Sequence, residues 1–276
     1  MKSKIVLGTV QFGCQYGINS VGRPSNDQIA DILQDAKAGG ISVLDTSSAY
    51  GDAESVLGNV NASSNFKIVS KYPKCDKTIK DTFEKSLEIL KTNHLYGYLL
   101  HHFEIYKENT SIWEEFIALQ ESGKTDRIGF SIYEPEELDF ILKNKVNFNL
   151  LQIPYNIFDR KFEPFFEQLK EMGVEIHVRS TFLQGLFFMD RANLPVNLLP
   201  LKQALLDLDA YAESINLTVG EVALNYNLQN KYIDGVLMGV DNKEQLMQNF
   251  KSVSDKKISC EFKIENKALL KPVNWN

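Results

Sequence analysis

Four polar residues in the first half of the chain have the types needed for proton transfer: Asp45, Tyr50, Lys71 and His101. A free tyrosine has a pKa of about 10, too high for an efficient acid at neutral pH, and a nearby ammonium group lowers it. Lys71 can supply that charge, Asp45 can pair with Lys71, and His101 can hydrogen-bond a substrate oxygen. The set suits protonation of a carbonyl oxygen that gains negative charge as the carbon accepts hydride. The hydride must come from a cofactor, because no side chain donates one.

Asp45, Lys71 and His101 belong to a longer series of polar residues, each of which directly follows a short apolar run. The six runs end at Asp45, Lys71, His101, Ser131, Gln152 and Arg179. Neighbouring members are 21 to 30 residues apart, which is about the length of one strand–helix unit. If the runs are parallel strands that close into a barrel, all six polar residues lie at its C-terminal rim, where barrel enzymes carry their chemistry.

Short apolar runs alternate with segments of helical periodicity along the whole chain. The expected strands are 5–10, 41–45, 66–71, 97–101, 126–130, 149–153, 175–178 and 235–238. The expected helices are 27–38, 78–90, 112–120, 135–142, 162–172, 201–214, 219–228 and 243–250. This alternation predicts a parallel α/β fold. The length of 276 residues fits a (β/α)₈ TIM barrel, and without a Pro/Gly/Ser-rich linker we expect residues 1–276 to form a single domain.

Composition and charge argue against several classes of protein. Hydrophobic content of 43% and charged content of 24% are typical of a globular domain. A net charge of −6 argues against a nucleic-acid partner, and no apolar stretch is long enough to make the membrane a partner. Cys14, Cys75 and Cys260 are widely separated, which indicates a reducing cytoplasm and no metal site. The Gly-x-Gly-x-x-Gly and P-loop motifs are absent, so a nucleotide would bind by other devices.

The residues that carry the predicted chemistry resemble the aldo-keto reductase superfamily over nearly the whole chain. Residues 45–51 read DTSSAYG and, with Glu54 and the Leu-Gly pair at 57–58, are similar to the family's first signature. Lys71 and His101 complete its catalytic tetrad. Gly123-Lys124, followed by Ile-Gly-Phe-Ser at 128–131, is similar to a further family segment.

The resemblance implies a TIM-barrel oxidoreductase that reduces an aldehyde or ketone, with a sugar or another polar carbonyl as a candidate substrate. Tyr50 would be the general acid, Lys71 and Asp45 would tune it, and His101 would orient the carbonyl. NADP(H) would be the preferred cofactor, with NAD(H) as the alternative and no metal. The partner would be a small-molecule carbonyl or alcohol, and the protein a cytoplasmic monomer or weak oligomer. Cofactor contacts are implied for Ser131, Gln152, Arg179, Ser180, Phe182, Gln184, Gly239, Gln245, Gln248 and Asn249.

Three positions depart from the family's usual cofactor contacts. Ile132 stands where an Asn often contacts the nicotinamide carboxamide, and Arg179 stands where many members place an aromatic ring against the nicotinamide. Gln245 occupies a position where many members carry a basic residue for the 2′-phosphate of NADP(H). Lys243 is close in sequence and could substitute for it.

The expected substrate pocket contains Phe12, Tyr16 and His102. His102 stands where the family often has a Trp, which favours a more polar substrate. Adjacent strand residues point to opposite faces, so His101 is expected to face the pocket directly and His102 to lie beside or behind it. Only 27 residues follow Asn249, which leaves little length for a C-terminal substrate loop and predicts an open pocket.

Two other functions remain open. The protein could be a catalytically weak nicotinamide-binding sensor or partner subunit on the same barrel, because Ile132, Arg179 and Gln245 alter the cofactor contacts. The intact tetrad argues against this reading. A lyase or isomerase that uses Lys71 to form a Schiff base is the third alternative.

Overall fold

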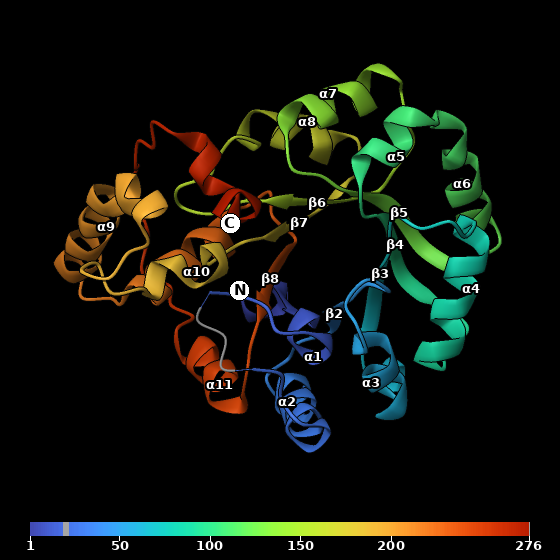
Figure 1. Cartoon of the computed structure of the whole chain (residues 1–276), viewed down its shortest axis with the longest axis horizontal. Coiled ribbons are helices and arrows are strands. Elements are labelled where there is room, and N and C mark those ends of the chain that lie inside the picture. The colour runs from blue at the N-terminus through green and yellow to red at the C-terminus, as the bar shows by residue number, and fades with distance from the viewer. Residues whose placement is uncertain (19–21, 276) are drawn as a thin grey trace.

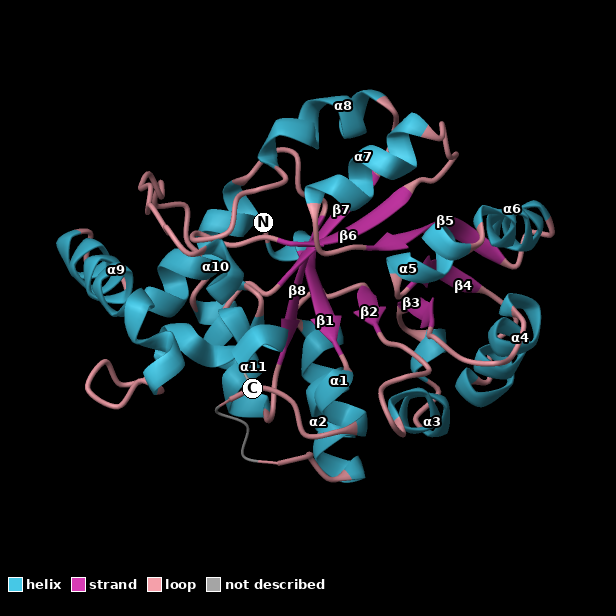
Figure 2. Ribbon diagram, turned by 45° about the horizontal axis from the view of Figure 1, so that its top comes forward, coloured by secondary structure: helices cyan, strands magenta, loops and turns pink. Residues whose placement is uncertain are grey.

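The computed structural model describes residues 1–18 and 22–275. Eight parallel strands close into a barrel in the order β1 to β8, and β8 pairs with β1. Helices surround the barrel (Figures 1 and 2). The strands are β1 (Ile5–Gly8), β2 (Val43–Asp45), β3 (Lys67–Tyr72), β4 (Leu95–Leu100), β5 (Thr125–Ser131), β6 (Leu150–Pro154), β7 (Glu175–Arg179) and β8 (Gly235–Gly239). The (β/α)₈ barrel predicted from the sequence is therefore confirmed.

Every predicted helical segment overlaps an observed helix, and three short α-helices were not predicted. The α-helices are α1 (Val10–Gly13), α2 (Asn26–Ala38), α3 (Ala53–Asn59), α4 (Ile79–Leu90), α5 (Phe103–Glu108), α6 (Trp113–Glu121), α7 (Pro135–Lys143), α8 (Phe166–Glu171), α9 (Lys202–Ser214), α10 (Val219–Gln229) and α11 (Lys243–Lys251). The unpredicted helices are α1, α3 and α5. Short 3₁₀ helices occupy Lys2–Lys4, Ala62–Ser64, Thr110–Ile112, Glu163–Phe165, Leu183–Phe188, Val196–Leu201, Lys267–Leu270 and Pro272–Trp275.

Local sequence signals explain where the longer helices begin. Ser25 caps α2, because its side chain accepts a hydrogen bond from the backbone N–H of Gln28. Thr218 caps α10 through the equivalent bond from Glu221. These caps satisfy backbone N–H groups that have no partner within the helix. Pro135 is the first residue of α7, a position where its missing N–H costs nothing.

The inside of the barrel is filled by side chains from alternate strand positions. Val69, Leu99 and Leu150 are fully buried and form an apolar layer at its centre. On β3, Lys67 and Lys71 lie two residues before and after Val69 and share its face, because side chains alternate along a strand. The apolar layer therefore separates one polar end of the barrel, which includes Lys71, from the other.

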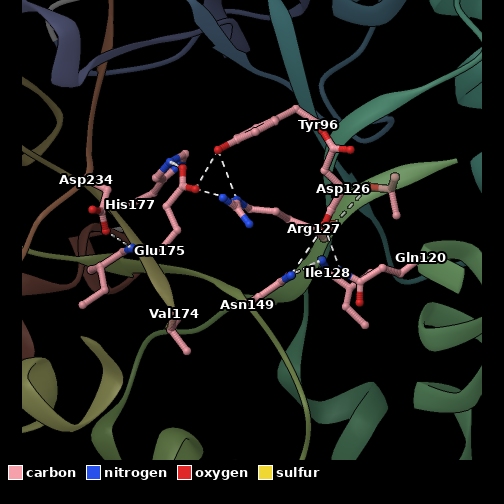
Figure 3. Close-up of polar contacts among 12 residues, drawn as sticks. Tyr96, Gln120, Asp126, Arg127, Ile128, Asn149, Val174, Glu175, His177 and Asp234 are labelled. Atoms are coloured by element: carbon pink, nitrogen blue, oxygen red, sulfur yellow. Dashed lines mark hydrogen bonds and ion pairs between the residues drawn. The ribbon is translucent and has the colours of Figure 1, made fainter. Parts of the chain in front are cut away.

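A charged cluster occupies the N-terminal mouth of the barrel (Figure 3). Glu175, the first residue of β7, accepts hydrogen bonds from Tyr96 Oη at 2.6 Å and Arg127 Nε at 2.5 Å. Its other carboxylate oxygen lies 2.8 Å from Nε2 of His177. Residues of β4, β5 and β7 are thus linked at the end of the barrel that does not contain Lys71.

A second hydrophobic cluster lies beside the barrel, where α9 and α10 pack together (Figures 1 and 2). It includes Leu183 and Leu186 from the loop after β7, together with Ile264 and Leu270 from the C-terminal segment. The loop after β7 is thus anchored to the C-terminal segment. Within the described residues, no helix has the length and apolar character needed to cross a membrane.

Candidate active site

The loop after β2 carries Tyr50 over the C-terminal end of the barrel. The Tyr50 N–H donates to the carbonyl oxygen of Ser47 at 3.0 Å, and the Ala49 N–H donates to Ser47 Oγ at 3.1 Å. Helix α1 packs directly against this turn. A Cβ added to Gly13 would lie 1.6 Å from the carbonyl oxygen of Tyr50, so glycine is required there by close backbone approach.

Lys71 forms the centre of a buried polar group. Its Nζ donates to Asp45 Oδ1 at 2.5 Å and to the Thr46 carbonyl oxygen at 2.8 Å, and lies 3.5 Å from Tyr50 Oη. The Lys71 side chain is completely buried. Burial lowers the pKa of the Lys71 ammonium, while the Asp45 carboxylate acts in the opposite direction. The structure therefore brings Asp45, Tyr50 and Lys71 together as the sequence predicts.

Gln152 holds the carboxylate of this ion pair from the other side. Its Nε2 donates to Asp45 Oδ2 at 2.7 Å, so both carboxylate oxygens of Asp45 have a partner. We had expected Gln152 to contact a cofactor, and it does line the cavity described below. The hydrogen bond to Asp45 gives it a further role in holding the ion pair, which the sequence did not indicate.

Tyr50 is a neutral phenol in this environment. Burial raises its pKa above the usual value of 10, and the Asp45 charge adds to that effect, while Arg179 acts against it. The expectation that a nearby ammonium lowers this pKa is thus not met in the free protein, because burial disfavours the phenolate more strongly. Tyr50 keeps its proton at neutral pH and is available as a proton donor.

His101 directly follows β4 and lies beside Tyr50. The two ring centroids are 5.7 Å apart at an interplanar angle of 81°. Burial lowers the pKa of His101 to about 2, with the Lys71 charge as the next cause, so the imidazole is neutral. Its Nδ1 lies 3.2 Å from Ser47 Oγ.

A cavity of about 1000 Å³ starts at Asp45, Tyr50 and His101 and reaches the turn between β8 and α11. All the predicted cofactor residues except Ser131 line it: Gln152, Arg179, Ser180, Phe182, Gln184, Gly239, Gln245, Gln248 and Asn249. Ser131 is the last residue of β5 and is buried with 3% exposure. The volume is at the upper end of the range for small-molecule and cofactor sites.

The loop after β7 forms one wall of the cavity in a strained conformation. Ser180, Leu183 and Gln184 have positive φ angles of 65°, 47° and 52°. Such angles are uncommon for residues other than glycine and cost energy, so they persist where surrounding contacts enforce them. Gln184 also donates to Tyr16 Oη at 2.8 Å, which links this wall to the first loop of the barrel.

Of the three residues predicted to line the substrate pocket, one lines the cavity and two do not. Tyr16 lines the cavity, as expected. Phe12 does not, because it belongs to α1 and is completely buried in the main hydrophobic core. His102 is exposed at the N-cap of α5, with its ring 5.0 Å from that of His101, and is not among the lining residues. Its position is explained by the helix that begins immediately after it.

Arg179 projects into the cavity from the end of β7. Its Nη2 donates to the Ile132 carbonyl oxygen at 3.0 Å, and its guanidinium carbon lies 3.9 Å from the centre of the Tyr133 ring. The position that carries an aromatic ring in many relatives is thus filled here by a cation stacked on an aromatic residue of another loop. Tyr133 belongs to no motif or strand end, so the sequence analysis did not single it out.

Several other lining residues were also missed by the sequence reasoning. They are Gln11, Thr181, Phe188, Asp241, Glu244 and the first turn of α10. Phe188 is 55% exposed, which is unusual for a large apolar side chain. The sequence analysis searched for polar residues at the ends of apolar strands. It could not find these residues, because they lie in loops and at the starts of helices.

Comparisons with known proteins agree with this architecture. The sequence model of the Aldo/keto reductase family matches residues 4–265. An oxidoreductase of Bacillus subtilis (strain 168), YqkF, is 25% identical, with the alignment covering 94% of this chain and 91% of that protein.

Solved structures with the same fold include two from other bacteria. The aldo-keto reductase AKR11C1 of Bacillus halodurans, in its holo form, matches with a TM-score of 0.74 and 22% identity over 97% of this chain and 90% of that one. PA4992, a putative aldo-keto reductase of Pseudomonas aeruginosa, matches with a TM-score of 0.67 and 20% identity over 90% of this chain and 88% of that one.

Proposed function

This chain belongs to the aldo/keto reductase family, and from that membership we propose that it reduces an aldehyde or ketone to an alcohol with Tyr50 as the general acid. The family implies a nicotinamide cofactor. The observation that carries the proposal is the meeting of Asp45, Tyr50, Lys71 and His101 at one end of a large cavity.

The cavity residues fit an extended dinucleotide. Gly239 lets the Gln11 side chain approach the end of β8 closely, because a Cβ there would lie 2.3 Å from Gln11 Oε1. That oxygen is buried and has no hydrogen-bond partner within the part of the chain that the structure describes, so it is free to accept one from a ligand. Gln152 and Arg179 would hold the end near Tyr50. When bound, the nicotinamide supplies the hydride.

The side chains around Tyr50 account for the proton transfer. Tyr50 donates its phenolic proton to the carbonyl oxygen as that oxygen gains negative charge. The phenolate left behind is costly in a buried site, and the Lys71 ammonium, 3.5 Å away, stabilises it. Asp45 keeps Lys71 charged and in place, and neutral His101 donates a hydrogen bond that orients the carbonyl.

We also propose that the substrate is a small polar carbonyl compound. The cavity near Tyr50 is lined by Tyr16, Tyr133 and Arg179, which offer hydroxyl and guanidinium groups as well as aromatic surface. Such a lining suits a substrate with several oxygen atoms, such as a sugar, better than a purely apolar aldehyde.

An assay with NADH and NADPH and a panel of aldehydes and sugars tests the proposal. The Tyr50→Phe variant is expected to lose about a hundredfold or more in kcat, because general acid catalysis typically contributes that much. Tyr72→Phe is the matched control, because the Tyr72 hydroxyl donates to the Lys77 carbonyl oxygen and does not line the cavity. Full activity of Tyr50→Phe would contradict the acid role. Tight dinucleotide binding without turnover of any carbonyl would favour the sensor function instead.

A further inference from the structure

The proposed function, on which this inference rests, fixes how a dinucleotide must lie in the cavity. The nicotinamide has to be near Tyr50 and His101, because hydride and proton are delivered to the same carbonyl group. The rest of an extended dinucleotide then follows the cavity to its other end. That end, the adenosine end, is formed by residues of the β8–α11 turn and of α11: Asp241, Asn242, Glu244, Gln245, Gln248 and Asn249.

The adenosine end of the cavity is acidic. It contains the carboxylates of Asp241 and Glu244. Gln245 is tied to Asp241, since its Oε1 accepts from the Asp241 N–H at 2.8 Å and its Nε2 lies 3.4 Å from Asp241 Oδ2. Among the lining residues that the structure describes, Arg179 is the only Lys or Arg, and it lies at the end of β7 against Tyr133.

Lys243, the cation closest in sequence to Gln245, is paired outside the cavity. Its Nζ lies 3.0 Å from Asp35 Oδ2 on α2, and the hydrogen bond and charge of Asp35 raise the pKa of the Lys243 ammonium. Lys243 is not among the lining residues. The basic group that could have replaced the usual residue at position 245 is therefore already paired with a carboxylate.

The start of α11 does not compensate for the missing cation. A helix N-terminus attracts anions through its free N–H groups and its dipole. Here the Asn242 side chain accepts a hydrogen bond from the Gln245 N–H, and Glu244 places a negative charge in the first turn. Both features reduce the attraction of this helix end for a further anion.

We propose that this protein prefers NAD(H) to NADP(H), with Asp241 and Glu244 as the specificity-determining residues. The 2′-phosphate of NADP(H) carries a charge of about −1.5 to −2 at neutral pH. At this end of the cavity the described lining residues would offer it the carboxylates of Asp241 and Glu244 and no Lys or Arg side chain. The free 2′-hydroxyl of NAD(H) can donate a hydrogen bond to a carboxylate, as it does in other NAD sites. The charge distribution thus favours the opposite cofactor from the one that family resemblance implies.

Calorimetric titration of the full chain with NADH and with NADPH tests the preference without depending on turnover. The Kd for NADH is expected to be about tenfold or more lower than that for NADPH, as for the gain or loss of a hydrogen bond to a charged group. An equal or lower Kd for NADPH would overturn the preference and leave the proposed function intact. Binding of neither dinucleotide would instead contradict the proposed function.

Variants at the adenosine end locate the cause of the preference. Gln245→Arg is expected to lower the Kd for NADPH by about tenfold or more, because it adds a cation, with little effect on NADH. Glu244→Gln is expected to lower the Kd for NADPH and to raise that for NADH, because the 2′-hydroxyl loses a charged acceptor. Lys243→Gln is expected to leave both Kd values unchanged. Weaker NADPH binding in Lys243→Gln would show that Lys243 leaves Asp35 to meet the phosphate, and would contradict the proposal. Asp255→Asn is the matched control, because Asp255 is an exposed carboxylate outside the cavity.

Discussion

The two ring nitrogens of His101 have different surroundings, and this decides which one carries the proton. With a pKa of about 2, the ring is neutral, so one nitrogen donates and the other accepts. Ser47 Oγ lies 3.2 Å from Nδ1 and accepts a hydrogen bond from the Ala49 N–H. Ser47 is completely buried, and its own proton would lack a partner unless it is donated to Nδ1. Nε2 is then the protonated nitrogen and can donate to a substrate oxygen.

Replacing Ser47 by Ala should weaken the proposed orientation of the substrate. Loss of one hydrogen bond of about 1 kcal/mol corresponds to a loss of about fivefold to tenfold in kcat, and Ser47→Thr, which keeps the hydroxyl, should recover most of it. The ¹⁵N signals of the His101 ring report the tautomer directly. The signals of His94, which is paired with Asp126, serve as an internal control. A wild-type spectrum with the proton on Nδ1 would contradict this assignment.

The buried pair of Asp45 and Lys71 should stabilise the fold only as long as both partners are present. Lys71→Met leaves Asp45 buried without its counter-ion and should lower the free energy of unfolding by roughly 3–5 kcal/mol. The double variant Asp45→Asn/Lys71→Met should recover much of that loss while remaining inactive. Urea denaturation of the two single variants and the double variant gives the coupling energy. Additive losses would show that the two side chains do not act as a pair.

At the scale of elements, strands were easier to predict than the short helices between them. All eight strands were found because a buried parallel strand is a continuous apolar run. Helices α1, α3 and α5 contain only 4, 7 and 6 residues, too few for a helical period to stand out. Their stability comes from packing against the barrel, which a local pattern does not contain.

Individual positions were also predicted wrongly where their place depends on packing or on contacts distant in sequence. The first strand was expected to extend to Val10, but β1 ends at Gly8 and Val10 begins α1. Because Phe12 lies on this helix, its side chain points into the core and not into the cavity. The hydrogen bond between Gln152 and Asp45 joins residues 107 positions apart, so it depends on barrel closure and strand register. The convergence of the catalytic residues could be predicted because the C-terminal ends of all the strands meet at one rim. The loops that line the cavity offered no comparable rule.

The cluster at the N-terminal mouth of the barrel (Figure 3) should make stability depend on pH. Burial alone would raise the pKa of Glu175, but its contacts with His177, Tyr96 and Arg127 lower it from 4.5 to about 2. Because the pKa is lower in the folded state, the stabilisation is complete above pH 4.5 and is lost as the pH falls toward 2. The shift corresponds to roughly 3 kcal/mol.

Urea unfolding measured between neutral pH and about pH 3 checks this contribution. In Glu175→Gln the free energy of unfolding should fall less steeply as the pH is lowered. The control Glu167→Gln changes an exposed carboxylate on α8 and should leave this pH dependence unchanged. An unaltered pH dependence in Glu175→Gln would show that other carboxylates determine the acid sensitivity.

At the scale of the whole molecule, the C-terminal segment supports the active-site wall from outside the cavity. Among the described residues after Ser252, 253–275, none lines the cavity. Ile264 and Leu270 instead pack in the second cluster with Leu183 and Leu186 from the loop after β7. The C-terminal segment thus packs against the strained loop after β7 and supports it from outside the cavity.

Leu270→Ala should therefore lower the stability without changing the chemistry. Leu270 is 4% exposed, and truncation of a buried Leu costs roughly 2–5 kcal/mol; a value near the lower limit is expected because a terminal segment can relax around the cavity. Leu269→Ala is the matched control, since Leu269 is only partly buried against the same cluster. Denaturation gives the free energy of unfolding, and kcat of the folded variant should equal that of the wild type. A large fall in kcat with little loss of stability would mean that the C-terminal segment reaches the reacting groups, in contradiction to its observed path.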